Sequence, residues 1–321
     1  MHYVHADQPG ISRKALKRGW AYYDEHGHRI TDREEIDRLN AIALPPAYSD
    51  AWFSPSPDAH LLATGRDARG RKQYRYHPRF RSRKERQKYA NCLCFGQALP
   101  ALRKRVARDL RQRKLTMERA VAALVRLLDC GHIRVGNEHY AKSNGSYGAC
   151  TLLMRHVDHR GTGLRIRYRG KGGKEQELEI DDRSLARFVR DMQDLPGQRL
   201  FQFLDPDGNL QTVGSTDVND YIRAAMGDAF TAKDFRTWGA SVAAFEALVE
   251  TDGELSPQAM AEIVAGRLGN TPVIARKSYI HPKLLEFAGK PPTASRKRRL
   301  KLLRGTRWLS PAERGLLKFL S

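Results

Sequence analysis

The sequence predicts an α+β protein with a small, strand-rich N-terminal domain, residues 1–80, and a larger, mainly α-helical domain, residues 81–321. Two patterns support this division. Short extended stretches alternate with turn signals in the first region, whereas apolar residues recur at helical spacing in the second. A chain of 321 residues also exceeds the size, about 250 to 300 residues, at which a single hydrophobic core stops growing.

The N-terminal region predicts two strand pairs and one helix. The segment WAYYDEHGHRI is typical of a hairpin that turns around Gly27, and two further extended arms flank a turn at residues 68–70. Thr31 and Glu34 have the spacing of a capping box, so we expect them to open a short helix. The prolines of LPPAY end that helix.

One face of the second strand pair mixes cations with aromatic side chains. Along RKQYRYH, the side chains of Lys72, Tyr74 and Tyr76 alternate onto the same face. Such a face suits a nucleic acid, because cations meet phosphates while aromatic residues or Gln73 meet sugars and bases. The alternative is an ordinary two-stranded ribbon whose tyrosines pack inward.

Beyond residue 80 the pattern is mostly helical. A long basic helix is expected to follow Arg79, and Met117 lies in a core helix that Gly131 ends. Further helices are predicted near Ser184, near Ser215, near Thr231 with Asp234 as a cap signal, and from Ser256 to Gly269. The basic tract SRKRRLKLLRGTRW near the C-terminus is interpreted as one side of a basic amphipathic helix.

The clearest hairpin is GLRIRYRGKGGKEQELEID. Apolar and basic residues alternate along its first arm, and its turn, residues 170–174, is rich in glycine and lysine. Its tip is therefore expected to be thin and cationic.

The charge of the chain points to a polyanionic partner. Lys and Arg number 57 against 36 Asp and Glu, which gives a net charge of +21. No apolar run of about 18 residues is present to cross a bilayer, and MHYVHADQPGISRK has no hydrophobic signal segment. We therefore expect a cytoplasmic protein without a membrane partner.

The cysteine and histidine spacing predicts neither a disulfide framework nor a metal site. The cysteines, expected to be reduced and mostly buried, are Cys92, Cys94, Cys130 and Cys150. Pairs of histidines occur without a carboxylate or thiol at ligand spacing, so they are interpreted as solvated side chains.

Several polar residues fall at the ends of predicted elements, and each has an ordinary structural interpretation. Arg134 and Arg236 are typical of surface cations or caps, and Lys171 of a turn lysine. Asn270 suits a helix end beside a glycine, and Tyr279 a half-buried aromatic residue. Spacing alone does not bring these five together.

Five ordered segments give these residues a common meaning. IRVGN, RGKGGK, DFRTWGA and GNTPVIARKSY closely resemble the signature segments of type IB DNA topoisomerases, in particular the compact bacterial enzymes akin to poxvirus topoisomerase. The stretch from LPPAY to HPRF resembles the N-terminal segment of the same bacterial group. The resemblance runs in order from about residue 44 to 282.

The resemblance implies a role for each residue of the set. Tyr279 matches the nucleophile that forms a 3'-phosphotyrosyl bond with DNA, and Arg134 and Arg236 match the arginines that hold the scissile phosphate. Lys171 matches the general acid that protonates the departing 5'-oxygen. Asn270 stands where the family has His or Asn in contact with a non-bridging oxygen.

The chemistry supports these residue types independently. Arginine offers a planar, permanently charged fork to the oxygens of a five-coordinate phosphate. A tyrosine with a pKa of about 10 is only about one part in a thousand phenolate at pH 7, so nearby cations or a proton acceptor must activate it. Transesterification conserves bond energy, and neither a nucleotide-binding loop nor magnesium-type carboxylate clusters occur in the sequence.

The same resemblance implies the partner and the mode of binding. We expect a monomer that needs no cofactor, metal or nucleotide and whose two basic domains form a clamp around duplex DNA. The expected DNA contacts are Arg71, Lys72, Gln73, Tyr74, Tyr76 and Tyr140.

Two other functions are consistent with part of the sequence. Tyrosine recombinases share the Arg, Lys, Arg and Tyr set, but they usually carry His-x-x-Arg where this chain has Lys233 to Arg236, and they usually begin with a helical domain. A non-enzymatic architectural DNA binder explains the charge but not the ordered segments.

Overall fold

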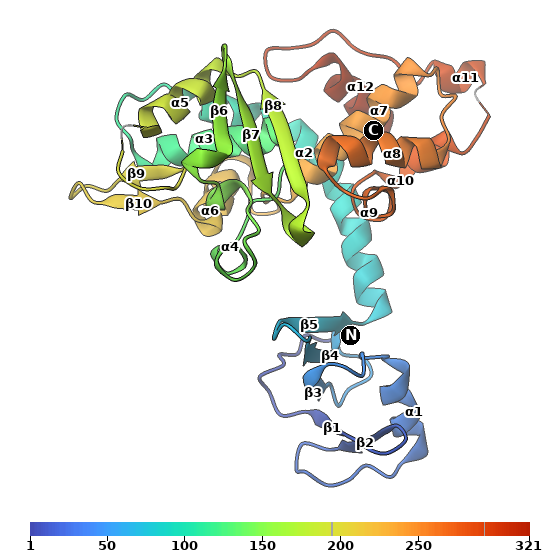
Figure 1. Ribbon diagram of the computed structural model, residues 1–321. Coiled ribbons are helices and arrows are strands. Elements are labelled where there is room, and N and C mark those ends of the chain that lie inside the picture. Colours follow the sequence, from blue (N-terminus) through green and yellow to red (C-terminus); the bar gives the residue numbers. More distant parts are fainter. Residues whose placement is uncertain (194, 292) are drawn as a thin grey trace. The chain divides into compact units, whose positions relative to one another are not determined.

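The computed structural model describes residues 1–193, 195–291 and 293–321, without the side chain of Tyr140. The chain divides into two compact units, Met1–Lys88 and Tyr89–Ser321, which Figure 1 shows in blue and in cyan to red. Helix α2, Pro78–Asp109, begins in the first unit and continues through the second. The domain boundary expected at 80/81 therefore falls inside a continuous helix, and that division stays a prediction.

The first unit is a small antiparallel sheet with one helix. Its strands are in the order β2-β1-β3-β4-β5. The elements are β1 Ile11–Ala15, β2 Trp20–Tyr23, α1 Arg33–Ala41, β3 Ser49–Phe53, β4 Leu61–Arg66 and β5 Lys72–Tyr76. Leu39 of α1 packs with Tyr22 and Phe53 of the sheet in a separate hydrophobic core. The strand-rich N-terminal region that the sequence predicts is confirmed.

The hairpin predicted around Gly27 forms, whereas the predicted helix cap in this unit was wrong. Backbone hydrogen bonds of 2.9 Å join Asp24 to His28 and Ile30 to Tyr22 across the turn, and β2 also pairs with β1. Helix α1 begins after Asp32, whose carboxylate accepts a hydrogen bond from the Glu34 amide at 3.2 Å. Aspartate is preferred to threonine as an N-cap residue, so Asp32 caps the helix in place of the predicted Thr31.

The second unit is mainly helical and holds a three-stranded sheet. Its elements are α3 Met117–Gly131, α4 Glu138–Asn144, η1 Ala149–Thr151, η2 Met154–His156, β6 Val157–Arg160, β7 Gly163–Arg169, η3 Lys171–Gly173, β8 Glu175–Ile180, α5 Arg183–Gln193, β9 Gln202–Leu204, β10 Leu210–Thr212, α6 Ser215–Met226, α7 Asp234–Glu250, α8 Pro257–Leu268, α9 Pro272–Ser278, α10 Pro282–Ala288, α11 Ala294–Lys297 and α12 Pro311–Leu320. The predicted hairpin is confirmed as β7 and β8, and β6 adds a third strand.

The core of this unit surrounds α3 and α7. Helix α3 is buried on nearly every side, although Met117, expected in the core, remains 38% exposed at its start. Gly131 is the last helical residue, and His132 adopts the left-handed conformation (φ 48°) that the sequence assigned to a glycine stop. A non-glycine residue in this conformation costs about 1 kcal/mol or more, so tertiary contacts must hold it there.

The C-terminal segment differs from its predicted form. Only the first three residues of the basic tract, 295–297 in α11, are helical, and the chain is irregular from there to the start of α12. Ser310 and Glu313 form a capping box at that start, and α12 packs against α7. All four cysteines are free. Cys92 and Cys150 are buried, whereas Cys94 and Cys130 are exposed, contrary to the expectation of mostly buried thiols.

A buried ionic cluster joins α7 to three other helices. The guanidinium of Arg103 on α2 donates to Asp129 on α3 at 2.8 Å and to Glu313 on α12 at 2.7 Å. Glu313 also accepts a hydrogen bond from Trp238 Nε1 on α7 at 3.0 Å. The indole lies so close to Gly96 that a Cβ there would be 2.2 Å from the ring. The cluster therefore fixes α7 against α2, α3 and α12.

We expect Arg103→Met to lower the free energy of unfolding by about 3 to 5 kcal/mol, because buried Glu313 loses its cation and buried Asp129 keeps only Arg126, at 3.5 Å. The matched control is Arg223→Met, which removes an exposed pair with Asp220 and should change stability by less than about 1 kcal/mol. Urea unfolding followed by circular dichroism measures both variants. Equal, small losses would contradict a supporting role for the cluster.

Candidate active site

Four of the five predicted site residues meet in the second unit. The side-chain oxygen of Asn270 accepts hydrogen bonds from Arg134 Nη2 at 3.3 Å and from Arg236 Nη2 at 2.9 Å. The guanidinium carbon of Arg236 lies 4.8 Å from the ring centroid of Tyr279. One cluster thus forms from the ends of α3, α8 and α9 and from α7. Spacing alone did not predict it.

The chain reaches Asn270 and Tyr279 through two short, well-capped helices. Gly269 ends α8 in the left-handed conformation (φ 63°), as the sequence predicts, and the next residue turns toward the arginines. Thr271 then caps α9, a helix of 7 residues that ends at Tyr279. The amide of Tyr279 donates to the Ala275 carbonyl at 3.1 Å, and the side chain is 9% exposed. The tyrosine is therefore held at a helix end and nearly buried.

Arg236 is fixed by acceptors that carry no full charge. Its guanidinium donates to the carbonyl of His132, to that of Leu268 at 3.3 Å, and to Asn270. Burial lowers the pKa of Arg236, and the neighbouring charge of Arg134 lowers it further, while Tyr279 acts in the opposite direction. Within the described residues neither arginine forms an ion pair with a carboxylate. The pair therefore keeps a positive charge available for an anion.

Tyr279 differs from the other phenol beside these arginines. Burial raises the pKa of Tyr279, but the charge of Arg236, its hydrogen bond, and the charges of Arg134 and Lys233 together bring that pKa below its ordinary value. Burial instead raises the pKa of Tyr168 to about 12, although the same two arginines act against it. Tyr279 is thus the phenol that loses its proton more readily.

Two supporting residues were missed from the sequence. His132 presents its carbonyl to Arg236 from the left-handed turn after α3, and its ring lies against Gly239 on α7. A Cβ at Gly239 would be 2.5 Å from ring atoms of His132. The sequence did contain one signal for His132. Gly239 lies inside the predicted helix of RTWGA, and a glycine at such a position usually marks the close approach of another group to the helix. Lys233, which faces the Tyr279 charge, had no comparable signal.

Lys171 lies at the exposed tip of the β7–β8 hairpin. In the part of the chain that the structure describes, no hydrogen bond or ion pair joins it to the other four residues. The hairpin itself reaches their neighbourhood, because Gln176 on β8 lies so close to Gly269 that a Cβ there would be 1.9 Å from its side-chain oxygen. The end of β8 next to the tip therefore contacts the turn before Asn270, whereas Lys171 itself is exposed.

The predicted DNA contacts of the first unit lie on and around β5. Tyr74 and Tyr76 are 49% and 39% exposed, with ring centroids 6.0 Å apart and an interplanar angle of 10°. The alternative that these tyrosines pack inward is therefore wrong. Lys72 is exposed, and Asp67 fixes the side chains of Arg71 and Gln73 at 2.7 and 2.9 Å. Tyrosines of this kind offer flat apolar faces beside cations.

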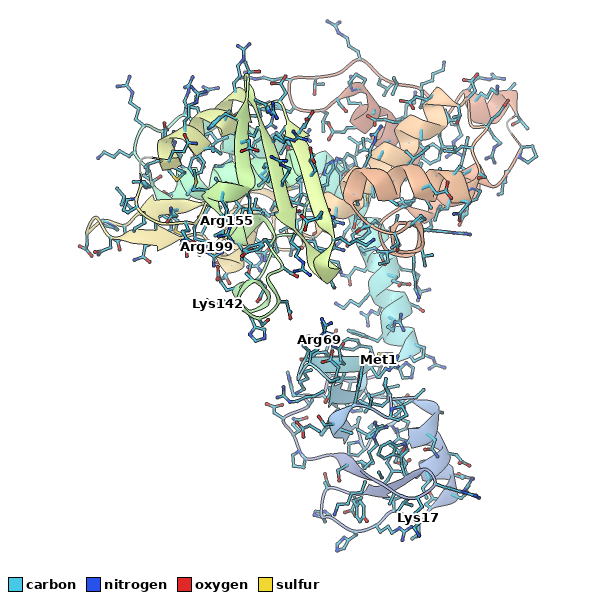
Figure 2. The ribbon with its side chains drawn as sticks, in the orientation of Figure 1. Met1, Lys17, Arg69, Lys142, Arg155 and Arg199 are labelled. Carbon is cyan, nitrogen blue, oxygen red and sulfur yellow. The ribbon has the colours of Figure 1, made fainter. Side chains whose placement is uncertain are left out.

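Tyr140 lies on α4, but its side chain falls outside the described part of the structure. The edge of the second unit around α4 is rich in cations. Figure 2 labels Lys142 on this helix and Arg155 and Arg199 nearby. Arg199 donates to Glu138 of α4 at 2.5 Å and to the Thr151 carbonyl at 2.9 Å, so that arginine is held against the helix.

Across the residues that the structure describes, His, Cys, Asp and Glu side chains do not gather in threes as metal ligands do. Nor does any described helix have the length and apolar character needed to cross a membrane.

Comparisons with known proteins agree with this geometry. Residues 77–278 match the family of the eukaryotic DNA topoisomerase I catalytic core, and residues 19–67 match the bacterial DNA topoisomerase IB N-terminal domain. DNA topoisomerase 1B of Acanthamoeba polyphaga mimivirus is 30% identical over 280 residues, which are 83% of each chain. DNA topoisomerase 1 of Mycosarcoma maydis is 26% identical over 193 residues, 54% of this chain and 19% of that protein.

The catalytic-core match holds Arg134, Lys171, Arg236 and Asn270 but ends one residue before Tyr279. The two matches lie in both structural units, in agreement with the predicted fold class. The chain belongs to the type IB DNA topoisomerases.

Proposed function

We propose that this protein relaxes both positive and negative supercoils in duplex DNA by transient cleavage of one strand through a 3'-phosphotyrosyl bond to Tyr279. The released strand swivels and is then religated, without ATP or a metal ion, by a monomer. The observation that carries the proposal is the contact of Tyr279 with Arg236, which shares Asn270 with Arg134.

The cleavage step is a balanced exchange of one phosphoester for another. The Tyr279 oxygen attacks the phosphorus and releases its proton to solvent, and a new P–O bond forms. The bond from phosphorus to the 5'-oxygen breaks as Lys171 protonates that oxygen. Arg134 and Arg236 stabilise the charge that gathers on the non-bridging oxygens. Because the ester energy is retained in the protein–DNA bond, the 5'-hydroxyl can reverse the reaction without a nucleotide.

Asn270 serves this chemistry with both ends of its amide. Its oxygen accepts from the two arginines, whereas its Nδ2 is buried and has no hydrogen-bond partner in the structure. A buried donor without a partner costs about 1 to 3 kcal/mol, and a phosphate oxygen would relieve that cost. We therefore assign Nδ2 as the donor to the scissile phosphate.

Lys171 is assigned as the general acid to the departing 5'-oxygen, and it must move to reach that oxygen. The two glycines that follow it, Gly172 and Gly173, have φ values of 78° and 77°, which other residues rarely adopt. The tip is exposed, and its conformation depends on these glycines. We propose that it docks on the active site when DNA binds.

The two basic units are proposed to enclose the duplex as a clamp. Arg71, Lys72, Gln73, Tyr74 and Tyr76 are assigned to the DNA surface of the first unit, and Tyr140 to that of the second. Counterion release from the phosphates then makes binding weaken steeply with salt. Since the N-terminal domain family is bacterial, we place this activity at the bacterial nucleoid.

Wild-type protein is expected to relax plasmids of either supercoil sign in EDTA without ATP, and Tyr279→Phe is expected to abolish relaxation and the covalent DNA adduct. The reason is that phenylalanine keeps the ring but lacks the attacking oxygen. Gel relaxation and denaturing capture of the adduct measure the two losses, with duplex binding retained as the control for folding. Strict need for magnesium or ATP would contradict the proposal.

Lys171→Ala is expected to slow cleavage of an ordinary 5'-oxygen substrate by about 100-fold or more, because the departing alkoxide lacks its acid. A substrate with a 5'-sulfur leaving group should be cleaved at nearly the wild-type rate, since a thiolate leaves without protonation. Single-turnover cleavage of both substrates makes the test. Equal slowing of the two would remove Lys171 from the general-acid role.

Asn270→Asp is expected to reduce the single-turnover cleavage rate by at least about 100-fold, because the carboxylate pairs with both arginines and repels the phosphate. Asn270→His is the matched control, since an imidazole N–H also donates to the phosphate and should retain cleavage within about tenfold of wild type. An active aspartate variant would exclude Nδ2 as the required donor.

A further inference from the structure

A second cationic site lies at the C-terminal half of α2, in a cavity of about 500 Å³. The polar and aromatic residues that line it are Lys104, Arg105, Arg108, Arg111, Arg307 and Trp308. A neighbouring cavity of about 460 Å³ shares Arg307 and Trp308 with it. We call the first cavity the α2 basic cavity.

The α2 basic cavity is distant from the candidate active site. The hydroxyl of Tyr89 on α2 contacts the carbonyl of Lys277, two residues before Tyr279. Arg108 lies further along the same helix, at a rise of 1.5 Å per residue, or about 28 Å from Tyr89. A phosphate held beside Tyr279 therefore does not occupy this cavity.

The cations of the cavity are arranged in one stripe. Lys104, Arg108 and Arg111 follow each other at helical spacing of four and three residues. Like charges at this spacing destabilise a helix. Within the described chain, Lys104, Arg111 and Arg307 form no ion pair with a carboxylate, so their charges are available to a ligand.

A buried carboxylate orients part of the stripe. Asp109 accepts from Arg108 Nε at 2.8 Å and from the Tyr221 hydroxyl at 2.8 Å. The guanidinium of Arg105 lies 4.1 Å from the centroid of the Tyr221 ring, which holds it in place. Because Arg108 is bound through Nε, its terminal nitrogens remain as donors. The carboxylate of Asp109 neutralises one positive charge, whereas the cavity is lined by one lysine and four arginines.

We propose that the α2 basic cavity binds a compact ligand that carries several linked phosphates, such as a nucleoside triphosphate or a short inorganic polyphosphate. Guanidinium groups pair with phosphate through charge-assisted, paired hydrogen bonds. The volume lies in the range of small-molecule sites, about 300 to 1,000 Å³, and suits a compact ligand rather than a duplex. Trp308 at the edge supplies an aromatic ring for a base, should the ligand be a nucleotide.

The test uses the full chain and titration calorimetry with inorganic triphosphate at constant ionic strength. Arg108→Gln/Arg111→Gln should weaken binding by about tenfold or more, since charge-assisted hydrogen bonds from two guanidinium groups are lost. The control Arg187→Gln/Arg190→Gln removes two exposed charges from α5 and should stay within about twofold of wild type. Plasmid relaxation by the Arg108/Arg111 variant without triphosphate should match that of wild type.

A second titration with ATP distinguishes the two sources of phosphate. Tighter binding of ATP than of triphosphate, with a change in fluorescence that Trp308→Phe removes, identifies a nucleotide site. Equal affinities identify a polyphosphate site. Equal weakening in both double variants, or loss of affinity only for duplex DNA in the Arg108/Arg111 variant, would overturn the proposal.

Discussion

The candidate active site depends on one neutral acceptor shared by two cations. Asn270 holds Arg134 and Arg236 side by side through a single oxygen, at 3.3 and 2.9 Å. A carboxylate in its place would neutralise the pair and compete with a phosphate, whereas an amide orders the guanidinium groups and leaves their charge intact. The lowered pKa of Tyr279 follows from the same arrangement, because the charge and hydrogen bond of Arg236, together with the charges of Arg134 and Lys233, outweigh the opposing effect of burial.

This arrangement requires a rigid support, and α7 supplies it. Arg236 lies two residues before Trp238, which packs on Gly96 and donates to Glu313 in the ionic cluster with Arg103. On its other side α7 contacts His132, whose strained turn presents a carbonyl to Arg236. Both the left-handed turn at His132 and the burial of the ionic cluster are energetically unfavourable by themselves. Tight packing around Arg236 offsets them.

The sequence predicted the parts that local chemistry determines. The β7–β8 hairpin and the caps of α8 follow from alternation, glycine and Ser–Pro signals, and the structure confirms them. The convergence of Arg134, Arg236, Asn270 and Tyr279 required a family resemblance, because contacts between residues 34 to 136 positions apart leave no local signal. The turn at His132 and the irregular basic tract were missed since tertiary contacts there override propensity. Neither the sequence nor the structure brings Lys171 to the other four residues, because the proposed docking of the hairpin tip depends on DNA.

The near burial of Tyr279 also determines which molecules can reach it. Tyr3 and Tyr74, at 69% and 49% exposed, are available to oxidants and modifying enzymes, while the Tyr279 side chain is 9% exposed. In the proposed intermediate, the same enclosure keeps bulk water from the phosphotyrosine ester. Hydrolysis of that ester would turn a reversible break into a permanent nick. In the proposed reaction, the low exposure of this ester to water therefore protects the continuity of the DNA during each cycle.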